Sequence, residues 1–405
     1  MIINETNLNR NWTTYKLAEL GEFSRGKSKH RPRDDKRLFE NGKYPLIQTG
    51  DISNSNLYVK KHSQMYSDFG LSQSKLWPKG TLCITIAANI AEVAILAYPM
   101  CFPDSIVGFN ADSTKTSNEF MYYVFKFIQQ HIQKMASGSI QDNINIDYLL
   151  SLEFKIPTLK EQEAILHSLL TFDNKIENNT LVNDNLMELA KTLYQSWFVN
   201  YEPFGGIKPT DWIDGTINDL GNEIICGKTP PTQKAEYYGG NTPFITIPDM
   251  HDCVYNVSTE RYLSAAGVAS QSKKSLPTNT VCVSCIGTAG LVTIVSEESQ
   301  TNQQINSIVP KDGISPYYTY LLMKTLSETI NTLGQSGSTI VNLNKTEFGK
   351  IQVTIPSKHI MQKFNYLCGP LFEKIHSAQK ENKKLASLRD WLLPMLMTGQ
   401  VTISD

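Results

Sequence analysis

The chain has 405 residues, 40% hydrophobic and 19% charged, a composition typical of folded globular proteins and not of disordered chains. Its 38 Lys and Arg nearly balance 39 Asp and Glu, so the net charge of -1 excludes a uniformly cationic, histone-like protein while allowing a local basic surface. The length predicts two or three domains.

Cysteine usage and hydropathy favour a cytoplasmic location for the chain. The seven cysteines are an odd number without framework spacing, which argues against a disulfide scaffold. The first residues, MIINETNLNRNW, contain no basic segment leading into an apolar stretch, so we expect no signal peptide. The most apolar stretch, residues 84–100, contains Asn89 and Glu92 and falls short of a membrane-spanning helix.

The two halves of the chain repeat each other at an offset of about 200 residues. The matching segments keep their order: YPLIQTGDI (44–52) with TPFITIPDM (242–250), GTLCITI (80–86) with NTVCVSC (279–285), and SGSIQDNIN (137–145) with SGSTIVNLN (336–344). A period this long predicts a duplicated domain and not a solenoid.

Each repeat begins with about 145 residues of short β-branched and aromatic runs broken by Gly, Pro, Asn and Asp, a pattern typical of strands. Helical periodicity occurs within them at 118–135 and 317–333. We therefore expect two α+β globules. The expected strands lie in LCITIAA (82–88), VAILAY (93–98), SLEFKI (151–156), TVCVSC (280–285), LVTIV (291–295) and KIQVTI (350–355).

After Pro157 and Pro356 the pattern changes to one long helix in each repeat, with an apolar stripe spaced alternately by three and four residues. This spacing predicts a coiled-coil seam, with an ordinary core helix as the alternative. The prolines at 370 and 394 predict a kink or a late start in the second helix. The seam positions are Ile165, Leu169, Phe172, Ile176, Asn179, Asn183, Leu186, Ala190, Leu193 and Trp197, and Phe364, Cys368, Leu371, Ile375, Ala378, Asn382, Leu385, Arg389, Leu392 and Leu396.

The connection at 199–211 is rich in Pro and Gly and too short to return along the first helix, so the two helices are predicted to pack antiparallel. Matching the helix centres places Asn179 opposite Asn382 and Asn183 opposite Ala378.

Three motifs could indicate a catalytic or metal site, but each matches its pattern only in part. GEFSRGKS (21–28) fits the P-loop pattern, but no apolar strand precedes it and Pro32 follows where the helix should continue. Cys282 and Cys285 lack a second pair, and the expectation is a pair of buried thiols without metal. Asp104 and the Glu153–Lys155 segment only loosely resemble a nuclease site.

Residues 25–37, RGKSKHRPRDDKR, carry seven Lys and Arg against two Asp, a net charge of +5. The loop fits either a solvated surface or phosphate contact with base reading. Polar clusters recur at matching places in both repeats, as expected if two copies read different sites. We predict DNA contacts at Lys27, Lys29, Arg31, Arg33, Lys36, Arg37, Gln48, Thr49, Lys75, Asn89, Ser139 and Gln141, and at Lys228, Thr229, Gln233, Lys234, Thr246, Lys273, Lys274, Thr288 and Ser338.

The arrangement resembles the specificity subunit of type I restriction-modification enzymes. The resemblance covers residues 12–403. Its segments are WTTYKLAELGEFSRGKS (12–28), PLIQTGDIS (45–53), the SGS segment, IPTLKEQEAI (156–165), LMELAKTLYQSWFVNYEPF (186–204) and LASLRDWLLPMLMTGQV (385–401). The second repeat departs from it, since IPSKHIMQ lacks the acidic residue and glutamine found at 161 and 162.

The resemblance implies two target recognition domains, each followed by a conserved helix, and no catalysis or cofactor in this chain. The corresponding divisions are 1–158, 159–200, a linker at 201–211, 212–357 and 358–405. The implied partners are double-stranded DNA, modification subunits that methylate adenine with S-adenosylmethionine, and restriction subunits that use ATP and Mg. The alternatives are a P-loop-like nucleotide-binding enzyme and a coiled-coil protein scaffold.

The helix pair is also nearly self-complementary. We therefore predict that a fragment of residues 1–205 dimerises and directs methylation to a palindromic site.

Overall fold

The computed structural model describes residues 12–87, 90–137, 146–335, 341–401 and 403. The chain forms two compact units, which are built alike. Unit 1 comprises Met1–Lys175 and Leu385–Asp405, and unit 2 comprises Ile176–Lys384.

The main sheet of unit 1 has five strands. Their order is β2 (Gly21–Arg25), β10 (Ile106–Ala111), β7 (Leu82–Thr85), β8 (Val93–Leu96) and β4 (Tyr58–Val59). The two strands β7 and β8 are buried on both faces, because alternate residues enter two different cores. Leu82 and Ile84 pack in the core beneath helix α4 (Asn118–Ser137), while Cys83 packs with Trp77 on the opposite face.

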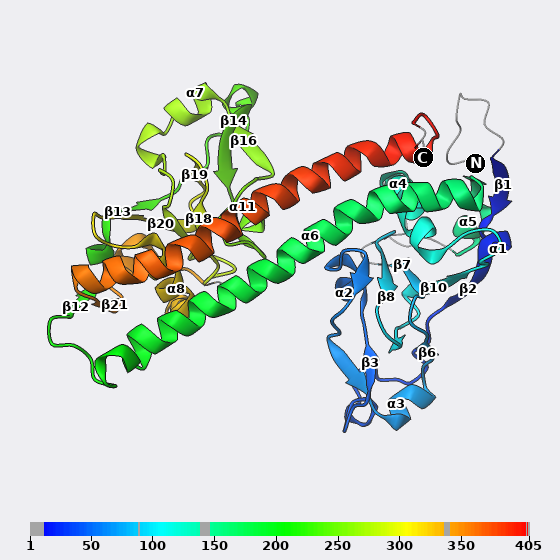
Figure 1. Cartoon of the computed structure of the whole chain (residues 1–405), viewed down its shortest axis with the longest axis horizontal. Helices are drawn as coiled ribbons and strands as arrows, with labels where there is room; N and C mark the ends of the chain where they lie inside the picture. The colour runs from blue at the N-terminus through cyan, green and yellow to red at the C-terminus, as the bar shows by residue number, and fades with distance from the viewer. Residues whose placement is uncertain (1–11, 88–89, 138–145, 336–340, 402, 404–405) are drawn as a thin grey trace. The chain divides into compact units, whose positions relative to one another are not determined.

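Smaller elements complete unit 1 (Figure 1). A second sheet has the order β5 (Gln64–Tyr66), β3 (Tyr44–Leu46), β9 (Met100–Cys101) and β6 (Leu76–Trp77), and β1 (Thr13–Lys16) pairs antiparallel with β11 (Glu153–Ile156). The short helices are α1 (Leu17–Leu20), η1 (Lys36–Leu38), α2 (Thr49–Ser53), α3 (Asp68–Ser72) and α5 (Ile146–Ser151).

Unit 2 repeats this topology, so the duplication in the sequence is also a duplication of the fold. Its main sheet has the order β13 (Gly221–Cys226), β20 (Ile305–Pro310), β17 (Val281–Ser284), β18 (Val292–Val295) and β15 (Tyr255–Asn256). Its smaller sheets are β16 (Arg261–Leu263), β14 (Tyr238–Ile245) and β19 (Gln300–Thr301), and the pair β12 (Ile213–Thr216) and β21 (Gln352–Ile355). The short helical elements are η4 (Ile217–Leu220), η5 (Ala235–Tyr237), η6 (Pro248–Met250), α7 (Ala265–Ala269), η7 (Ser272–Lys274) and α10 (Lys345–Gly349).

The strands and the α+β class expected from the sequence are confirmed, and one expected helix is divided. The helix predicted at 317–333 forms α8 (Pro316–Thr325) and α9 (Ser327–Gly334). Leu326 leaves helical geometry with a ψ of 1°, and the Ser327 hydroxyl donates a hydrogen bond of 2.7 Å to the carbonyl of Gly290. The helix therefore breaks where a side chain bonds to the turn between β17 and β18.

The two long helices are α6 (Leu159–Tyr194) and α11 (Lys358–Met397). A π-helical turn, Gln195–Val199, and a 3-10 turn, Glu202–Phe204, follow α6. Of the kink or late start predicted for the second helix, the late start is wrong, because α11 begins two residues after Pro356 and is helical through both of its prolines. Proline 370 is exposed, so its ring faces solvent.

The antiparallel packing of the two helices is confirmed within each unit (Figure 1). In unit 1, Ile165 and Leu396 share one core, and Asp173 contacts Arg389. In unit 2, the side-chain amide of Asn179 donates a hydrogen bond of 2.8 Å to Asn382, the residue predicted to lie opposite it. Every predicted seam position is buried or half-buried, which confirms the heptad pattern.

The two helices start differently, as the departure from the family pattern indicates. Glu161 accepts hydrogen bonds from the backbone and side chain of Thr158, and buried Gln162 donates to the carbonyls at 115 and 157. The matching positions in unit 2 are Ile360 and Met361, which pack into its core. Polar capping is thus replaced by apolar packing. Among the described residues, no helix has both the length and the apolarity needed to cross a bilayer.

Candidate nucleic-acid interface

A glycine–lysine turn leaves the edge strand of the main sheet at the same place in both units. The amide of Gly26 lies 2.9 Å from a carbonyl of β10, and the amide of Gly227 lies 3.2 Å from a carbonyl of β20. A Cβ at Gly26 would lie 2.3 Å from one backbone oxygen, and a Cβ at Gly227 would lie 2.1 Å from another. Only glycine permits this approach, and the lysine that follows each glycine is exposed.

The turn is not a P-loop. A P-loop requires a helix that begins at its lysine and surrounds the phosphates with backbone amides. The chain after Lys27 is irregular until the short 3-10 turn at Lys36–Leu38. The nucleotide-binding alternative based on residues 21–28 is therefore wrong.

The basic loop of unit 1 exposes its cations, and two of them are paired with acids. The Arg33 guanidinium lies 2.9 Å from the Asp104 carboxylate, and that of Arg37 lies 2.7 Å from Asp35. These arginine side chains remain 56% and 67% exposed, so the pairs are weak and phosphates can replace the acids. The exposed cations of the loop are Lys27, Lys29, Arg31, Arg33, Lys36 and Arg37.

Asp35 holds the loop in shape. Its carboxylate accepts hydrogen bonds from the guanidinium of Arg37 and from His30 Nε2, and it caps the 3-10 turn through the backbone amide of Arg37. The bond to the Arg37 side chain, followed by that to His30, keeps the pKa of Asp35 well below its usual range. Arg31 donates to the carbonyls of Ser28 and His30, at 2.6 and 2.8 Å. The loop is therefore an ordered cationic surface.

Lys75 adds a further cation next to β6. Its ammonium lies 3.6 Å above the ring of Trp77, which is stacked on Phe102 at 4.8 Å. This cation–π contact limits the freedom of an exposed lysine. The backbone around it is joined to the basic loop, since the amide of Lys29 donates to the carbonyl of Gln73.

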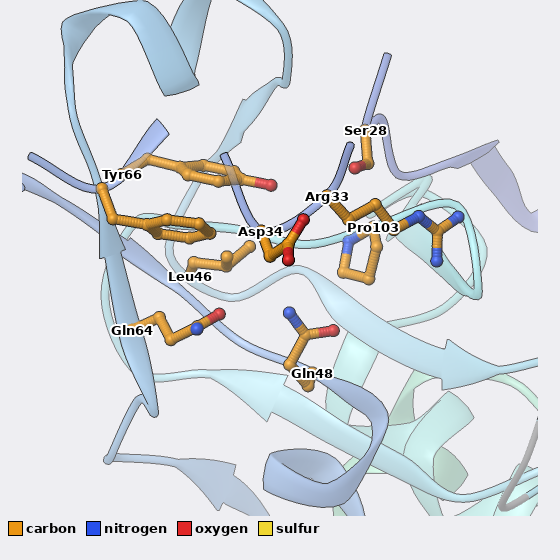
Figure 2. Close-up of a pocket in the computed structure, with 9 residues that line it drawn as sticks. Ser28, Arg33, Asp34, Leu46, Gln48, Gln64, Tyr66 and Pro103 are labelled. Atoms are coloured by element: carbon orange, nitrogen blue, oxygen red, sulfur yellow. The ribbon is translucent and has the colours of Figure 1, made fainter. Parts of the chain in front are cut away.

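A pocket of about 340 Å³ opens beside the basic loop (Figure 2). Its apolar walls are Leu46, Pro103 and the rings of Phe39 and Tyr66, which stack at 5.6 Å. Its polar lining comprises Ser28, Arg33, Asp34, Gln48 and Gln64. Figure 2 shows the amides of Gln48 and Gln64 and the carboxylate of Asp34 pointing toward one another.

The pocket combines the groups that bind the edge of a nucleobase. Amides present a donor beside an acceptor, as required for adenine, and a carboxylate accepts from exocyclic amino groups. The sequence predicts DNA contacts at Gln48 and Arg33 but not at Asp34, Gln64 and Tyr66. Asp34 entered the prediction only as one negative charge in the net charge of residues 25–37. Gln64 lies in β5, and its pairing with β3 could not be predicted from the sequence. Thr49, the first residue of α2, is half-buried beside Gln48.

The predicted residues of unit 2 surround its own glycine–lysine turn only in part. The Lys228 carbonyl accepts a hydrogen bond of 2.8 Å from buried Gln271, and the Thr229 hydroxyl donates to Gln303 at 2.8 Å. The Lys234 ammonium lies 3.1 Å from the hydroxyl of Tyr237. Of the other predicted residues of unit 2, Gln233, Lys273 and Thr288 are exposed and Lys274 is half-buried.

Thr246 occupies a structural position. It is 5% exposed, and its hydroxyl donates a hydrogen bond of 2.6 Å to Asp249 at the start of η6. We therefore leave it out of the proposed surface. Four further predicted residues, Asn89, Ser139, Gln141 and Ser338, lie outside the described residues.

The cysteine pair is buried, as expected from the sequence. Cys282 and Cys285 are 0% and 1% exposed, and burial raises the pKa of each thiol to about 12. Such thiols are inert toward oxidants and metals. In the described part of the chain, no three His, Cys, Asp or Glu side chains are arranged to hold a metal ion.

Comparison with known proteins agrees with this architecture. The profile of the type I restriction modification DNA specificity domain matches residues 9–186 and 209–368. The chain is 35% identical to the type I restriction enzyme HindI specificity subunit of Haemophilus influenzae, over 96% of this chain and 99% of that protein. It is 24% identical to the MjaIX specificity subunit of Methanocaldococcus jannaschii, over 98% and 95%. The crystal structure of the type I S subunit from M. genitalium superposes with a TM-score of 0.60 at 19% identity, over 98% of this chain and 99% of that one.

Proposed function

This chain belongs to the type I restriction-modification specificity family as a non-catalytic DNA specificity subunit, and we propose that each unit reads one half of a bipartite, asymmetric site. The observation that carries the proposal is the repeated glycine–lysine turn, which starts a different polar surface in each unit. Two copies of one scaffold with unlike loops suit two unlike half-sites.

In unit 1 we assign the two tasks of DNA binding to neighbouring surfaces. The exposed cations of residues 27–37 and Lys75 contact phosphates, which supply affinity but no sequence information. The pocket beside them, with Gln48, Gln64 and Asp34, contacts base edges. The position of the pocket next to the cations supports this division.

In unit 2 the corresponding phosphate contacts come from Lys228, Lys234, Lys273 and Lys274. Thr229, Gln233 and Thr288 are the polar candidates for base contact. The contact of Lys234 with Tyr237 restricts the position of this ammonium. This surface offers four predicted cations against seven in unit 1, so we expect it to bind its half-site with a lower salt dependence.

The chain acts in a larger assembly in this proposal. Residues 1–158 and 212–357 are the target recognition domains, and 159–200 and 358–405 carry the two long helices. Modification subunits with S-adenosylmethionine and restriction subunits with ATP and Mg supply the chemistry and the cofactors. We place the assembly in the cytoplasm, in keeping with seven cysteines that are all free.

The test is to replace residues 212–357 by those of another family member and to map methylated adenines across a genome that carries the system. We expect one half-site to change and the other to remain. The matched control replaces residues 12–157 and should change the opposite half-site. A change of both half-sites in either exchange would contradict independent reading by the two units.

A further inference from the structure

A buried ionic triad ties α6 to α11 in unit 1. Asp173 on α6 is 7% exposed and receives the guanidinium of Arg389 on α11 at 2.5 Å. Its second carboxylate oxygen accepts a hydrogen bond from the hydroxyl of Tyr123 on α4. Burial raises the pKa of Tyr123 far above its usual value, so its hydroxyl remains a donor. Both oxygens of the carboxylate are therefore satisfied, and the arginine supplies the compensating charge.

The matching positions of unit 2 are apolar. At the constant offset of 199 residues, Asp173 corresponds to Phe372 and Arg389 to Ala190. Aligning α4 and α8 on their capping serines places Leu321 at the position of Tyr123. These three residues are 0%, 0% and 2% exposed and share one core.

We propose that this difference determines which helix each long helix accepts as its partner. The buried face of α6 accepts a helix that brings an arginine to Asp173, and α11 of the same chain is such a helix. A second copy of α6 is rejected, and so is a pairing of two α11 helices. The partner that fits each helix is therefore the other helix of one chain.

The observed register determines which residues would meet in pairs of like helices. In an antiparallel pair of two α6 helices, each Asp173 faces Ala190 of the other copy, so two buried carboxylates lack a cation. In a pair of two α11 helices, each Arg389 faces Phe372. A buried charge without a partner is strongly unfavourable. The seam asparagines do not discriminate against the pair of two α6 helices, because Asn179 would meet Asn183 in place of Asn382.

This selection opposes the dimer of residues 1–205 that the near self-complementarity of the helices predicts. It also has a consequence for a cell that contains several such chains. Each α6 then pairs with an α11 and not with another α6, so every assembly carries one recognition domain of each kind and its DNA site remains asymmetric.

The test uses the full chain, folded and then cut. A protease site inserted after Gly206 lies in an exposed loop next to Ile207, which is 74% exposed. After cleavage, mild denaturant dissociates the halves 1–206 and 207–405, and return to buffer lets them pair again. Native mass spectrometry then measures the mass of each pair. Their different masses separate mixed pairs from like pairs. We expect mixed pairs to exceed like pairs by at least about 100-fold, the excess expected for an uncompensated buried charge. Like pairs at the statistical proportion of one half would overturn the proposal.

Variants separate the charge from the packing. Replacing the three triad residues by their counterparts in unit 2, with Tyr123→Leu, Asp173→Phe and Arg389→Ala, should raise the proportion of like pairs toward one half. Asp390→Ala is the matched control, because its carboxylate pairs with Arg389 at the surface, and it should leave the preference unchanged. A triple variant with the preference of the wild type would also overturn the proposal. The measurement on the wild-type chain decides the question even if the triple variant does not fold.

Discussion

The side-chain amide of Asn179 lies 2.8 Å from the amide oxygen of Asn382, a polar contact between two seam positions. The same amide nitrogen lies 2.7 Å from Glu381, and Asn382 donates in turn to the carbonyl of Ile176 at 3.3 Å. A shift of the register by one heptad would break these bonds and leave buried amides without partners. The contact therefore fixes the axial position of α6 against α11, as single seam asparagines do in coiled coils.

The basic loop is expected to contribute affinity more than sequence choice. Replacing Arg31 and Arg33 by alanine should make the slope of log K against log salt shallower by about 0.9 for each phosphate that is no longer neutralised. The measurement is DNA binding by the assembled complex across salt concentrations. Lys16→Ala, an exposed change on β1, is the control and should leave the slope unchanged. If the double variant also keeps the wild-type slope, these arginines do not bind phosphates.

The pocket is expected to contribute sequence choice more than affinity. Gln48→Ala and Gln64→Ala should each reduce discrimination at one half-site by about 1–3 kcal/mol, the range for a bidentate base contact, while the salt slope stays the same. Binding to duplexes with single substitutions in each half-site measures this. Gln130→Ala, an exposed position on α4, is the control. Equal reductions in affinity for all duplexes would place the glutamines at the backbone instead.

The ionic triad is expected to dominate the stability of unit 1 at the helix pair. Asp173→Ala should lower the free energy of unfolding by about 3 kcal/mol, the lower end of the range for a broken buried pair, because 23% of the Arg389 side chain is exposed. Replacing both members, with Asp173→Leu and Arg389→Met, should cost much less, because no charge is left alone. Hydrogen exchange of peptides from α4 reports on this unit. A double variant as unstable as Asp173→Ala would show that packing, and not charge, is the cause.

Unit 2 is expected to lose stability in mild acid through His376. Its ring is stacked on Tyr255 at 4.2 Å and its Nε2 lies 2.6 Å from the Ser296 hydroxyl. Burial, followed by the charge of Lys380, lowers the pKa of His376 below the ordinary value of 6.5. The unfolded chain therefore binds the proton first. The stabilisation is complete above pH 6.5 and is lost as the pH falls toward the lowered pKa of the folded state.

His376→Gln should remove this part of the pH dependence, and exposed His167→Gln should leave it unchanged. Hydrogen exchange of peptides from β15 and α11, at about one pH unit above and one below the ordinary histidine pKa, provides the measurement. A wild-type chain whose unit 2 is equally protected at both pH values would contradict the assignment.

The repeat, the seam and its register could be predicted because they depend on spacing along one chain. The pocket could not, because its walls come from separate segments that only the pairing of β3, β5 and β9 brings together. The triad could not be predicted for a related reason. Asp173 lies beside the seam and not on it, and its partners are 50 and 216 residues away. The burial of Thr246 could not be predicted, because a capping threonine and an exposed one look alike in sequence.

The glycine–lysine turns bear on how such a chain acquires new targets. At each turn the backbone is fixed by a close approach that only glycine permits, and this approach does not involve the side chains that follow. Residues 27–37 can therefore change their chemistry without moving the strand from which they leave. Because the same anchor occurs in both units, the surface proposed for recognition in either unit can change while the other, and the long helices, keep their structure. Diversification of the target is in this way separated from maintenance of the fold.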